Sequence, residues 1–245
     1  MNDPYARFDL ARANVLDLVL AQAELTPGAP AFTSGTRTLG YGDLAQLVAR
    51  LRFALAARGV ARKDHVACKV GKSPESLALF LAVLAEGAVY VPVNPGFGNR
   101  ETEEILADAQ PGLLILDQSE NTVSGCPTAG LFSDRSGVAL LDGMSASTAA
   151  PAPGGAEVCA AMLYTSGTTG RPKGARISHC NLSSSFTRIN GMWGITAQDR
   201  LLHVLPTFHA HGLLMATLCP LIAGAEIVMT ERFDIHETLR LLPHV

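Results

Sequence analysis

The sequence predicts an α/β fold in which mainly parallel sheets carry helices on both faces. Short apolar runs typical of buried strands alternate with segments whose apolar residues recur every three or four positions, the spacing of a helix packed on one side. The 245 residues are 48% hydrophobic, which is enough to bury a sizeable core. Glycine and proline punctuate most of the boundaries between these segments.

The first elements are helical with a short β pair between them. Apolar residues over 15–25 share one helical face, and Pro27 ends that segment. A β pair is expected over 31–41. The helical spacing over 44–55 is the most regular in the chain, and Gly59 follows it, where a helix can end in a left-handed residue.

The next elements alternate in the order strand, helix, strand, helix, strand. A buried strand is expected over 65–70, followed by a helix with Ser73 as its N-cap, Pro74 at its first position and Gly87 at its end. The stretches "VYVPVNP" and "LLILD" have strand character, and "NRETEEILADA" between them has acidic residues in the first turn of a helix.

This regular pattern is interrupted over 118–157, where Ser, Gly, Ala and Pro dominate. We therefore expect a first α/β sub-domain over 1–117, a loop-rich connection over 118–157 and a second part over 158–245. In that second part, "EVCAAMLY", "RLLHVLP" and "AEIVM" have strand character, and helices are expected over 180–189 and 213–221.

Composition excludes several classes of protein. The 19 Lys and Arg are outnumbered by 22 Asp and Glu and are scattered, so a nucleic-acid partner is not expected. The five cysteines are odd in number and never spaced as C-x-x-C, which fits neither a disulfide framework nor a zinc site. The acidic start resembles no signal peptide, and no apolar run reaches the roughly 18 residues of a membrane helix, so the cytoplasm is the expected location.

The stretch "TSGTTGRPKG" carries the strongest chemical signal. It directly follows an apolar strand, and ligands of open α/β folds bind beyond the carboxyl ends of strands. Glycines let backbone N–H groups approach a ligand, hydroxyls add donors and Lys173 adds a positive charge, a combination that suits polyphosphate oxygens. The spacing is not that of the Walker loop, which disfavours a P-loop kinase or GTPase. A plain surface turn is the alternative.

The longer stretch "YTSGTTGRPKG" resembles the signature loop of the adenylate-forming enzymes, which include acyl-CoA synthetases, luciferases and peptide-synthetase adenylation domains. "LAEGAVYVPVNP" and "VLPTFHAHGL" are similar to two further motifs of that family. The resemblance implies the N-terminal portion of the family's large domain. It also implies a reaction in which a carboxylate attacks the α-phosphate of ATP, pyrophosphate leaves, and coenzyme A takes the acyl group.

By this resemblance the loop holds the β- and γ-phosphates, with a magnesium ion, through Thr165, Ser166, Gly167, Thr168, Thr169, Gly170 and Lys173. Lys173 and His209 are assigned to catalysis, His209 as a residue that positions the acid. His211 is a weaker candidate. No residue is assigned as a metal ligand, and the remaining histidines are interpreted as structural. Trp193 and Phe208 are expected to pack in the core, with an acyl pocket as the alternative for Phe208.

Among members of the family, "LPTFHAHGLLMATLCPLIAGAEIVMTERFD" looks most like malonyl-CoA synthetases, and medium- or long-chain fatty acids are the alternative acids. The resemblance leads us to expect a truncated chain that lacks the small C-terminal domain and is inactive alone. Two hypotheses stand: the N-terminal fragment of an acyl-CoA synthetase, or a catalytically incompetent module that binds nucleotide phosphates. No oligomeric state is predicted.

Overall fold

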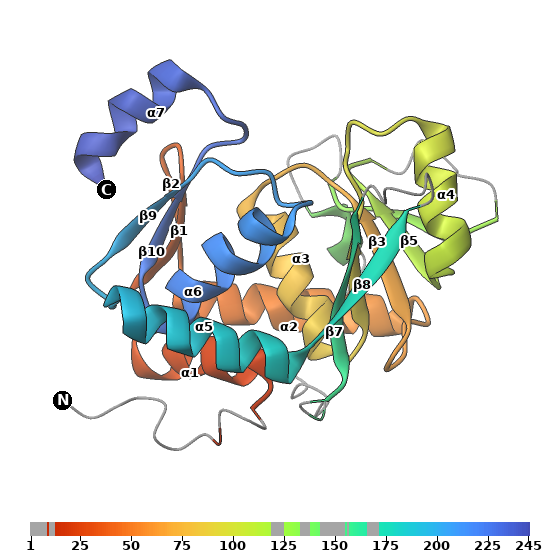
Figure 1. Cartoon of the computed structure of the whole chain (residues 1–245), viewed down its shortest axis with the longest axis horizontal. Helices are drawn as coiled ribbons and strands as arrows, with labels where there is room; N and C mark the ends of the chain where they lie inside the picture. Colours follow the sequence, from red (N-terminus) through yellow and green to blue (C-terminus); the bar gives the residue numbers. More distant parts are fainter. Residues whose placement is uncertain are drawn as a thin grey trace.

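The structure is a computed structural model that describes residues 9, 13–118, 125–132, 138–142, 155, 157–165 and 172–245. Two sheets stand on either side of a layer of helices (Figure 1). Helix α3 (Pro74–Ala85) lies in that layer and contacts a strand of each sheet. All of its residues are buried, so it forms the centre of the core.

The four-stranded sheet joins the two ends of the chain. Its order is β2-β1-β10-β9, and its strands are β1 (Pro30–Ser34), β2 (Arg37–Gly40), β9 (Arg200–His203) and β10 (Glu226–Met229). β10 runs parallel to both β1 and β9, whereas β1 and β2 form the expected antiparallel pair.

The six-stranded sheet has the order β6-β5-β3-β4-β7-β8. All of its pairs are parallel except β7 with β8. The prediction of mainly parallel sheets is therefore confirmed. The strands are β3 (His65–Lys69), β4 (Val89–Pro92), β5 (Leu113–Leu116), β6 (Thr128–Gly130), β7 (Cys159–Thr165) and β8 (Lys173–Ser178).

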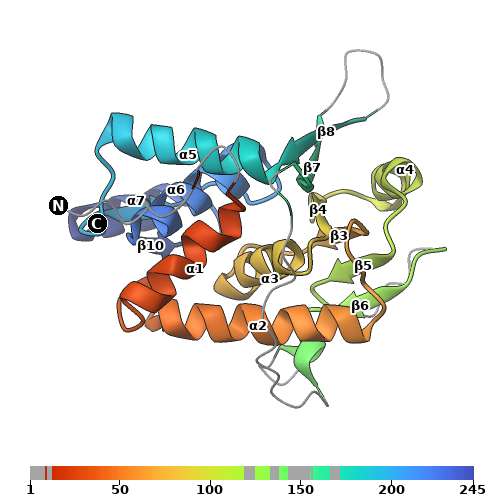
Figure 2. The ribbon, with the colours of Figure 1, turned by 90° about the horizontal axis from the view of Figure 1, so that it is seen from below.

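Helices cover both faces of the six-stranded sheet, as Figure 2 shows. Ala67 of β3 belongs to the apolar cluster under α4, whereas its neighbours Val66 and Cys68 belong to the central cluster on the opposite face. The remaining helical segments are α1 (Val15–Leu25), α2 (Tyr41–Ala57), α4 (Asn99–Ala109), α5 (His179–Trp193), the π-helix η2 (His211–Met215), α6 (Ala216–Ala223), α7 (Ile235–Leu241) and the 3-10 turns η1 (Ala139–Leu141) and η3 (Leu242–His244).

Local signals in the sequence mark several element boundaries correctly. The Ser73 side chain accepts a hydrogen bond from the Ser76 backbone N–H at 3.0 Å, as expected of an N-cap. Gly59 and Gly87 have φ values of 85° and 72°, the left-handed conformation that ends α2 and α3.

The expected division at 118–157 does not coincide with the boundary between the sheets, because each sheet takes strands from both sides of that segment. Its described parts also contain β6 and η1, where only loop was expected. The three-part domain division itself stays a prediction.

The expectation that Trp193 packs in the core was wrong. This side chain is 64% exposed, because it is the last residue of α5 and lies beyond the buried stretch of that helix.

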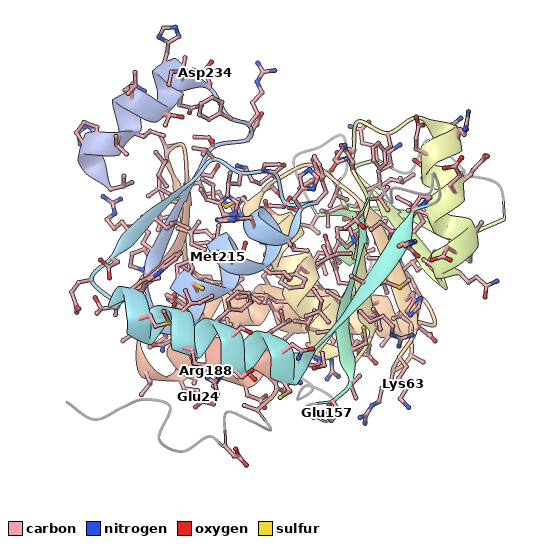
Figure 3. All side chains as sticks on the ribbon, in the orientation of Figure 1. Glu24, Lys63, Glu157, Arg188, Met215 and Asp234 are labelled. Carbon is pink, nitrogen blue, oxygen red and sulfur yellow. The ribbon has the colours of Figure 1, made fainter. Side chains whose placement is uncertain are left out.

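Helix α6 is fixed by three buried side chains that donate to carbonyl groups in or just after it. Gln22 bonds to the Ile222 oxygen at 2.9 Å, and Asn190 bonds to the Cys219 oxygen at 2.8 Å. The third donor is the Tyr41 hydroxyl, which reaches the Ala225 oxygen at 2.8 Å. Since η2 leads directly into α6, these contacts also fix the segment that enters it (Figure 3, Met215).

Helix α7 was not expected from the sequence. Asp234 caps it by accepting a hydrogen bond from the Glu237 N–H at 2.8 Å. Helix α7, whose N-cap is Asp234, projects from the body of the molecule (Figure 3). Its apolar side chains Ile235 and Leu239 are 51% and 60% exposed.

Candidate active site

The signature loop connects two antiparallel strands. Thr165 is the last residue of β7 and Lys173 the first of β8, and their Cα atoms are register partners. Both residues are exposed. The predicted residues Ser166, Gly167, Thr168, Thr169 and Gly170 lie outside the described residues. The structure thus places the two ends of the loop side by side.

The position of this hairpin agrees with the sequence-based expectation. β7 runs parallel to β4, with Ala161 paired to Tyr90. Parallel neighbours end at the same edge of a sheet, so Thr165 lies at the carboxyl edge, next to the end of β4. β8 then leads away from this edge as the edge strand of the sheet.

A contact that the sequence did not reveal holds the end of β7. The Tyr164 hydroxyl donates to Asp108 Oδ2 of α4 at 2.5 Å, and burial raises the pKa of Tyr164 above its ordinary value. On the facing strand, a Cβ at Gly174 would lie 2.2 Å from the Met162 methyl and 3.2 Å from Cζ of Tyr164. Gly174 therefore makes room for the side chains of β7.

The second motif lies between β9 and η2, where His203 holds the end of the strand. Nε2 of His203 lies 3.0 Å from the Gly212 carbonyl oxygen and donates to it. Burial, assisted by the charge of Lys72, lowers the pKa of His203 to about 4, so this imidazole is neutral near pH 7. Its Nδ1 has no hydrogen-bond partner in the described part of the chain. His203 thus connects β9 to η2.

His209 lies on the turn that enters η2 and is exposed, as is His211. The His209 ring contacts that of Phe208, with 4.5 Å between centroids and 55° between planes. Close packing fixes this turn, because a Cβ at Gly212 would come within 2.1 Å of the Pro206 carbonyl oxygen. The π-helix that follows is a rare conformation, often found at functional sites.

A cavity of about 800 Å³ lies beside the β9–η2 motif. It takes residues from the segments that follow β3, β4, β9 and β10, and so sits at the carboxyl ends of strands from both sheets. Phe208 lines it, which agrees with the pocket alternative considered for this residue. The lining residues are Val70, Gly71, Lys72, Asn94, Pro95, Gly96, Val204, Pro206, Thr207, Phe208, Glu231, Arg232 and Phe233.

Lys72 is a charged residue of this cavity that sequence reasoning missed. Its Nζ donates to the backbone oxygens of His203 at 2.8 Å and Leu205 at 3.2 Å. Burial lowers the pKa of Lys72 to about 8, and the carboxylate of Glu237 partly opposes that shift. The available signal was a lysine placed directly after a buried strand and before the N-cap of the next helix, in "GKSP".

The structure brings Thr165 and Lys173 together and places His209 on a segment that leads from the other sheet. Strand β4 links the hairpin to the cavity, since the loop after β4 lines the cavity and β7 ends beside β4. Within the described ranges, no group of three or more His, Cys, Asp and Glu side chains is placed to hold a metal ion. The helices described there include none long and apolar enough to cross a membrane.

Comparisons with known proteins identify the family that the chain matches. Residues 19–244 match the family described as AMP-binding enzyme. The chain is 33% identical to the indoleacetate–CoA ligase of Aromatoleum aromaticum, covering 88% of this chain and 45% of that protein. It is 34% identical to the mitochondrial malonate–CoA ligase of Xenopus laevis, covering 62% and 28%. ATP-bound MatB from Rhodopseudomonas palustris has a TM-score of 0.87 at 31% identity, covering 95% and 48%. The chain spans less than half the length of each.

Proposed function

The chain belongs to the AMP-binding enzyme family, and we propose that the protein containing it activates a carboxylic acid with ATP and transfers the acyl group to coenzyme A. The observation that best supports this proposal is the pairing of Thr165 with Lys173 at the carboxyl edge, where the ends of the signature loop meet. The relatives supply the reaction class, because the names of two of them describe CoA ligases.

The reaction has two steps. A carboxylate oxygen attacks the α-phosphorus of ATP, the bond to the bridging oxygen breaks, and pyrophosphate leaves. The thiolate of coenzyme A then attacks the acyl carbon and expels AMP. In the first step negative charge accumulates on the leaving pyrophosphate, so a positive charge and preorganised donors beside it lower the barrier.

We propose that Lys173 supplies the positive charge beside the leaving pyrophosphate. It is exposed at the start of β8, and its position is fixed by the ladder with β7. The loop residues Thr165, Ser166, Gly167, Thr168, Thr169 and Gly170 are proposed to donate to the same phosphates. The β7–β8 hairpin thus binds the pyrophosphate end of ATP in the proposed reaction.

His209 is proposed to position the acid. Its ring contacts Phe208, which lines the cavity, and the Leu213 N–H donates to its backbone oxygen at 2.9 Å. These contacts hold the turn in one place. A positioned imidazole beside the acid can orient the attacking carboxylate without transferring a proton.

The acid is proposed to be malonate or a fatty acid. The relatives do not decide between acids, since one is named for indoleacetate and another for malonate.

Magnesium is proposed to bind together with ATP, because Mg²⁺ usually binds substrate phosphates and only one or two carboxylates. The cytoplasm remains our proposal for the protein's location.

The test is exchange of labelled pyrophosphate into ATP by the protein expressed from its complete reading frame. We expect exchange that depends on malonate or octanoate, and release of AMP when coenzyme A is added. Formation of ADP, or exchange without any acid, would contradict the proposal. The 245-residue chain alone is expected to give no exchange. The alternative function, a phosphate-binding module, predicts ATP binding without exchange for the product of the complete reading frame.

A further inference from the structure

We propose that Lys72 is a positioning residue, whose ammonium group holds the turn that carries His209 in a fixed place relative to the β7–β8 hairpin. This inference rests on the proposed function, because it treats that turn as part of the acid site. Lys72 belongs to neither sequence motif, and its proposed role does not depend on which acid is activated.

The turn between β9 and η2, residues 204–210, has few hydrogen bonds that hold its backbone. At its end, the Leu213 N–H donates to the His209 oxygen at 2.9 Å. Within the described part of the chain, the backbone of residues 204–208 makes one hydrogen bond, in which Lys72 Nζ donates to the Leu205 oxygen at 3.2 Å. The same Nζ donates to the oxygen of His203, the last residue of β9, at 2.8 Å. Lys72 therefore fixes the start of the turn.

The backbone that carries Lys72 is itself fixed. Lys72 follows β3 of the six-stranded sheet, and the N–H of its neighbour Gly71 donates to Asp117 Oδ1 at 2.9 Å. Its other neighbour, Ser73, caps the buried helix α3. Because the half-buried side chain starts from a fixed base and ends on two backbone oxygens, it sets where the turn lies relative to the six-stranded sheet.

The place of the turn matters because the proposed reaction joins groups that the two sheets hold separately. The hairpin of the six-stranded sheet binds the phosphates, and the turn after β9 of the four-stranded sheet positions the acid. Lys72 connects the ends of β3 and β9, one strand from each sheet. A displacement of about 1 Å between reacting groups can lower a rate about 10²-fold. Loss of this connection should therefore impair use of the acid.

The charge of Lys72 makes its role depend on pH. Hydrogen bonds from an ammonium group are stronger than those from a neutral amine. Burial lowers the pKa of Lys72 to about 8, and the carboxylate of Glu237 partly opposes that shift. Its hydrogen bonds are therefore strongest below pH 8 and weaken as pH rises through that value. The charged and titratable groups around Lys72 are Glu237 of α7, neutral His203 of β9, Glu231 and Arg232 of the cavity wall, and Asp117 beside Gly71.

The experiment is pyrophosphate exchange by the protein expressed from its complete reading frame, with malonate or octanoate as the acid and with acid and ATP varied in turn. Lys72→Met should raise the KM for the acid at least about tenfold, the effect of losing a hydrogen bond from a charged group. The KM for ATP should stay within about twofold. A variant that merely lost folded protein would show a lower kcat and both KM values unchanged.

Lys69→Met is the matched control. Lys69, at the end of β3, also donates to a backbone oxygen, that of Phe97 at 2.6 Å, but this acceptor lies outside the turn. Both KM values should therefore be unchanged. Lys72→Arg keeps a charged donor and should bring the KM for the acid back to within about threefold of the wild-type value.

The pH profile separates the charge of Lys72 from the packing of its side chain. In the wild type the KM for the acid should rise about fivefold between pH 7 and pH 9, because a charged donor is replaced by a neutral one. In Lys72→Arg it should stay constant, since arginine remains protonated. Glu237→Gln removes a carboxylate that favours the protonated amine, so the rise should begin at a lower pH. This variant decides the proposal if substitutions of Lys72 prevent folding.

Amide hydrogen exchange gives a measurement that needs no catalysis. The Leu213 N–H bonds to the end of the turn, so its hydrogen should exchange at least about tenfold faster in Lys72→Met than in the wild type. The Leu114 N–H, which bonds to the Pro127 oxygen in the six-stranded sheet, should exchange at the wild-type rate.

An unchanged KM for the acid in Lys72→Met, or KM values for acid and ATP that rise together, would overturn the proposal. An unchanged rate at the Leu213 amide would overturn it too. A wild-type protein that exchanges no pyrophosphate with either acid would refute the proposed function instead. The Leu213 amide would then still decide whether Lys72 holds the turn.

Discussion

The β7–β8 hairpin and the β9–η2 segment carry the two halves of the candidate site, and they are held in different ways. The hairpin depends on a backbone ladder between neighbouring strands and on one side-chain contact to α4. The β9–η2 segment depends on groups from distant parts of the chain. Lys72 donates to the backbone oxygen of His203, and Asn190 donates to that of Cys219 in α6, the helix that η2 enters. The hairpin therefore displays its chemistry in contiguous sequence, whereas the β9–η2 segment is assembled by the fold.

The largest expected effect tests the chemistry of the hairpin. Lys173→Ala should lower pyrophosphate exchange by the intact protein about 10²-fold or more, because a preorganised charge at the leaving group is lost. Arg176→Ala is the control, since Arg176 is an exposed cation on the same strand, and exchange should change little. Unchanged exchange in the Lys173 variant would remove the phosphate role from this residue.

The next effect compares the packing of the two regions through a matched pair of glycines. Gly212→Ala should lower the unfolding free energy by about 1–3 kcal/mol, because its Cβ would meet the backbone oxygen of Pro206 at 2.1 Å. Gly174→Ala should cost less, since the nearest obstacle is the flexible end of Met162. Urea unfolding monitored by circular dichroism measures both. A larger loss at Gly174 would reverse the comparison.

A third prediction concerns pH and the buried core of the β9–η2 region. The pKa of His203 is lowered to about 4, below the 6.5 of an exposed histidine, so the unfolded chain binds this proton first as pH falls. The unfolding free energy should therefore decline from about pH 6.5 down to about pH 4, by roughly 3 kcal/mol for this group. His203→Gln keeps a donor for Gly212 and should flatten part of the decline. An unchanged slope would contradict it.

The smallest effect tests the anchor of the hairpin. Tyr164→Phe removes the hydroxyl that donates to Asp108 and should lower the unfolding free energy by about 1 kcal/mol. The partly open position of the pair keeps this value small. If thermal unfolding shows no difference but exchange falls, the contact would act by orienting Thr165 rather than by stabilising the sheet.

Sequence reasoning succeeded where the controlling contacts are local. Ser73, Gly59 and the bounds of α4 could be predicted, because caps and helical spacing depend on residues a few positions apart. The signature loop was visible for the same reason. The family resemblance supported the fold class.

Features that depend on distant partners could not be predicted. The role of Lys72 appears only when β9 is brought beside it, across about 130 residues. Each sheet combines strands from both halves of the chain, and no local pattern encodes these pairings. Trp193 was assigned to the core because an isolated aromatic usually packs there, but it is the last residue of α5 and lies beyond the buried stretch of that helix.

The pairing of β1 with β10 has a consequence for biosynthesis. Phe32 meets Ile227, so the four-stranded sheet closes a loop of about 195 residues. During translation the paired strands β1 and β2 leave the ribosome long before β10 exists. Contacts so distant in sequence form slowly, because the entropy of loop closure must be overcome before they stabilise the chain. β1 is thus expected to remain an unpaired sheet edge until β10 has emerged.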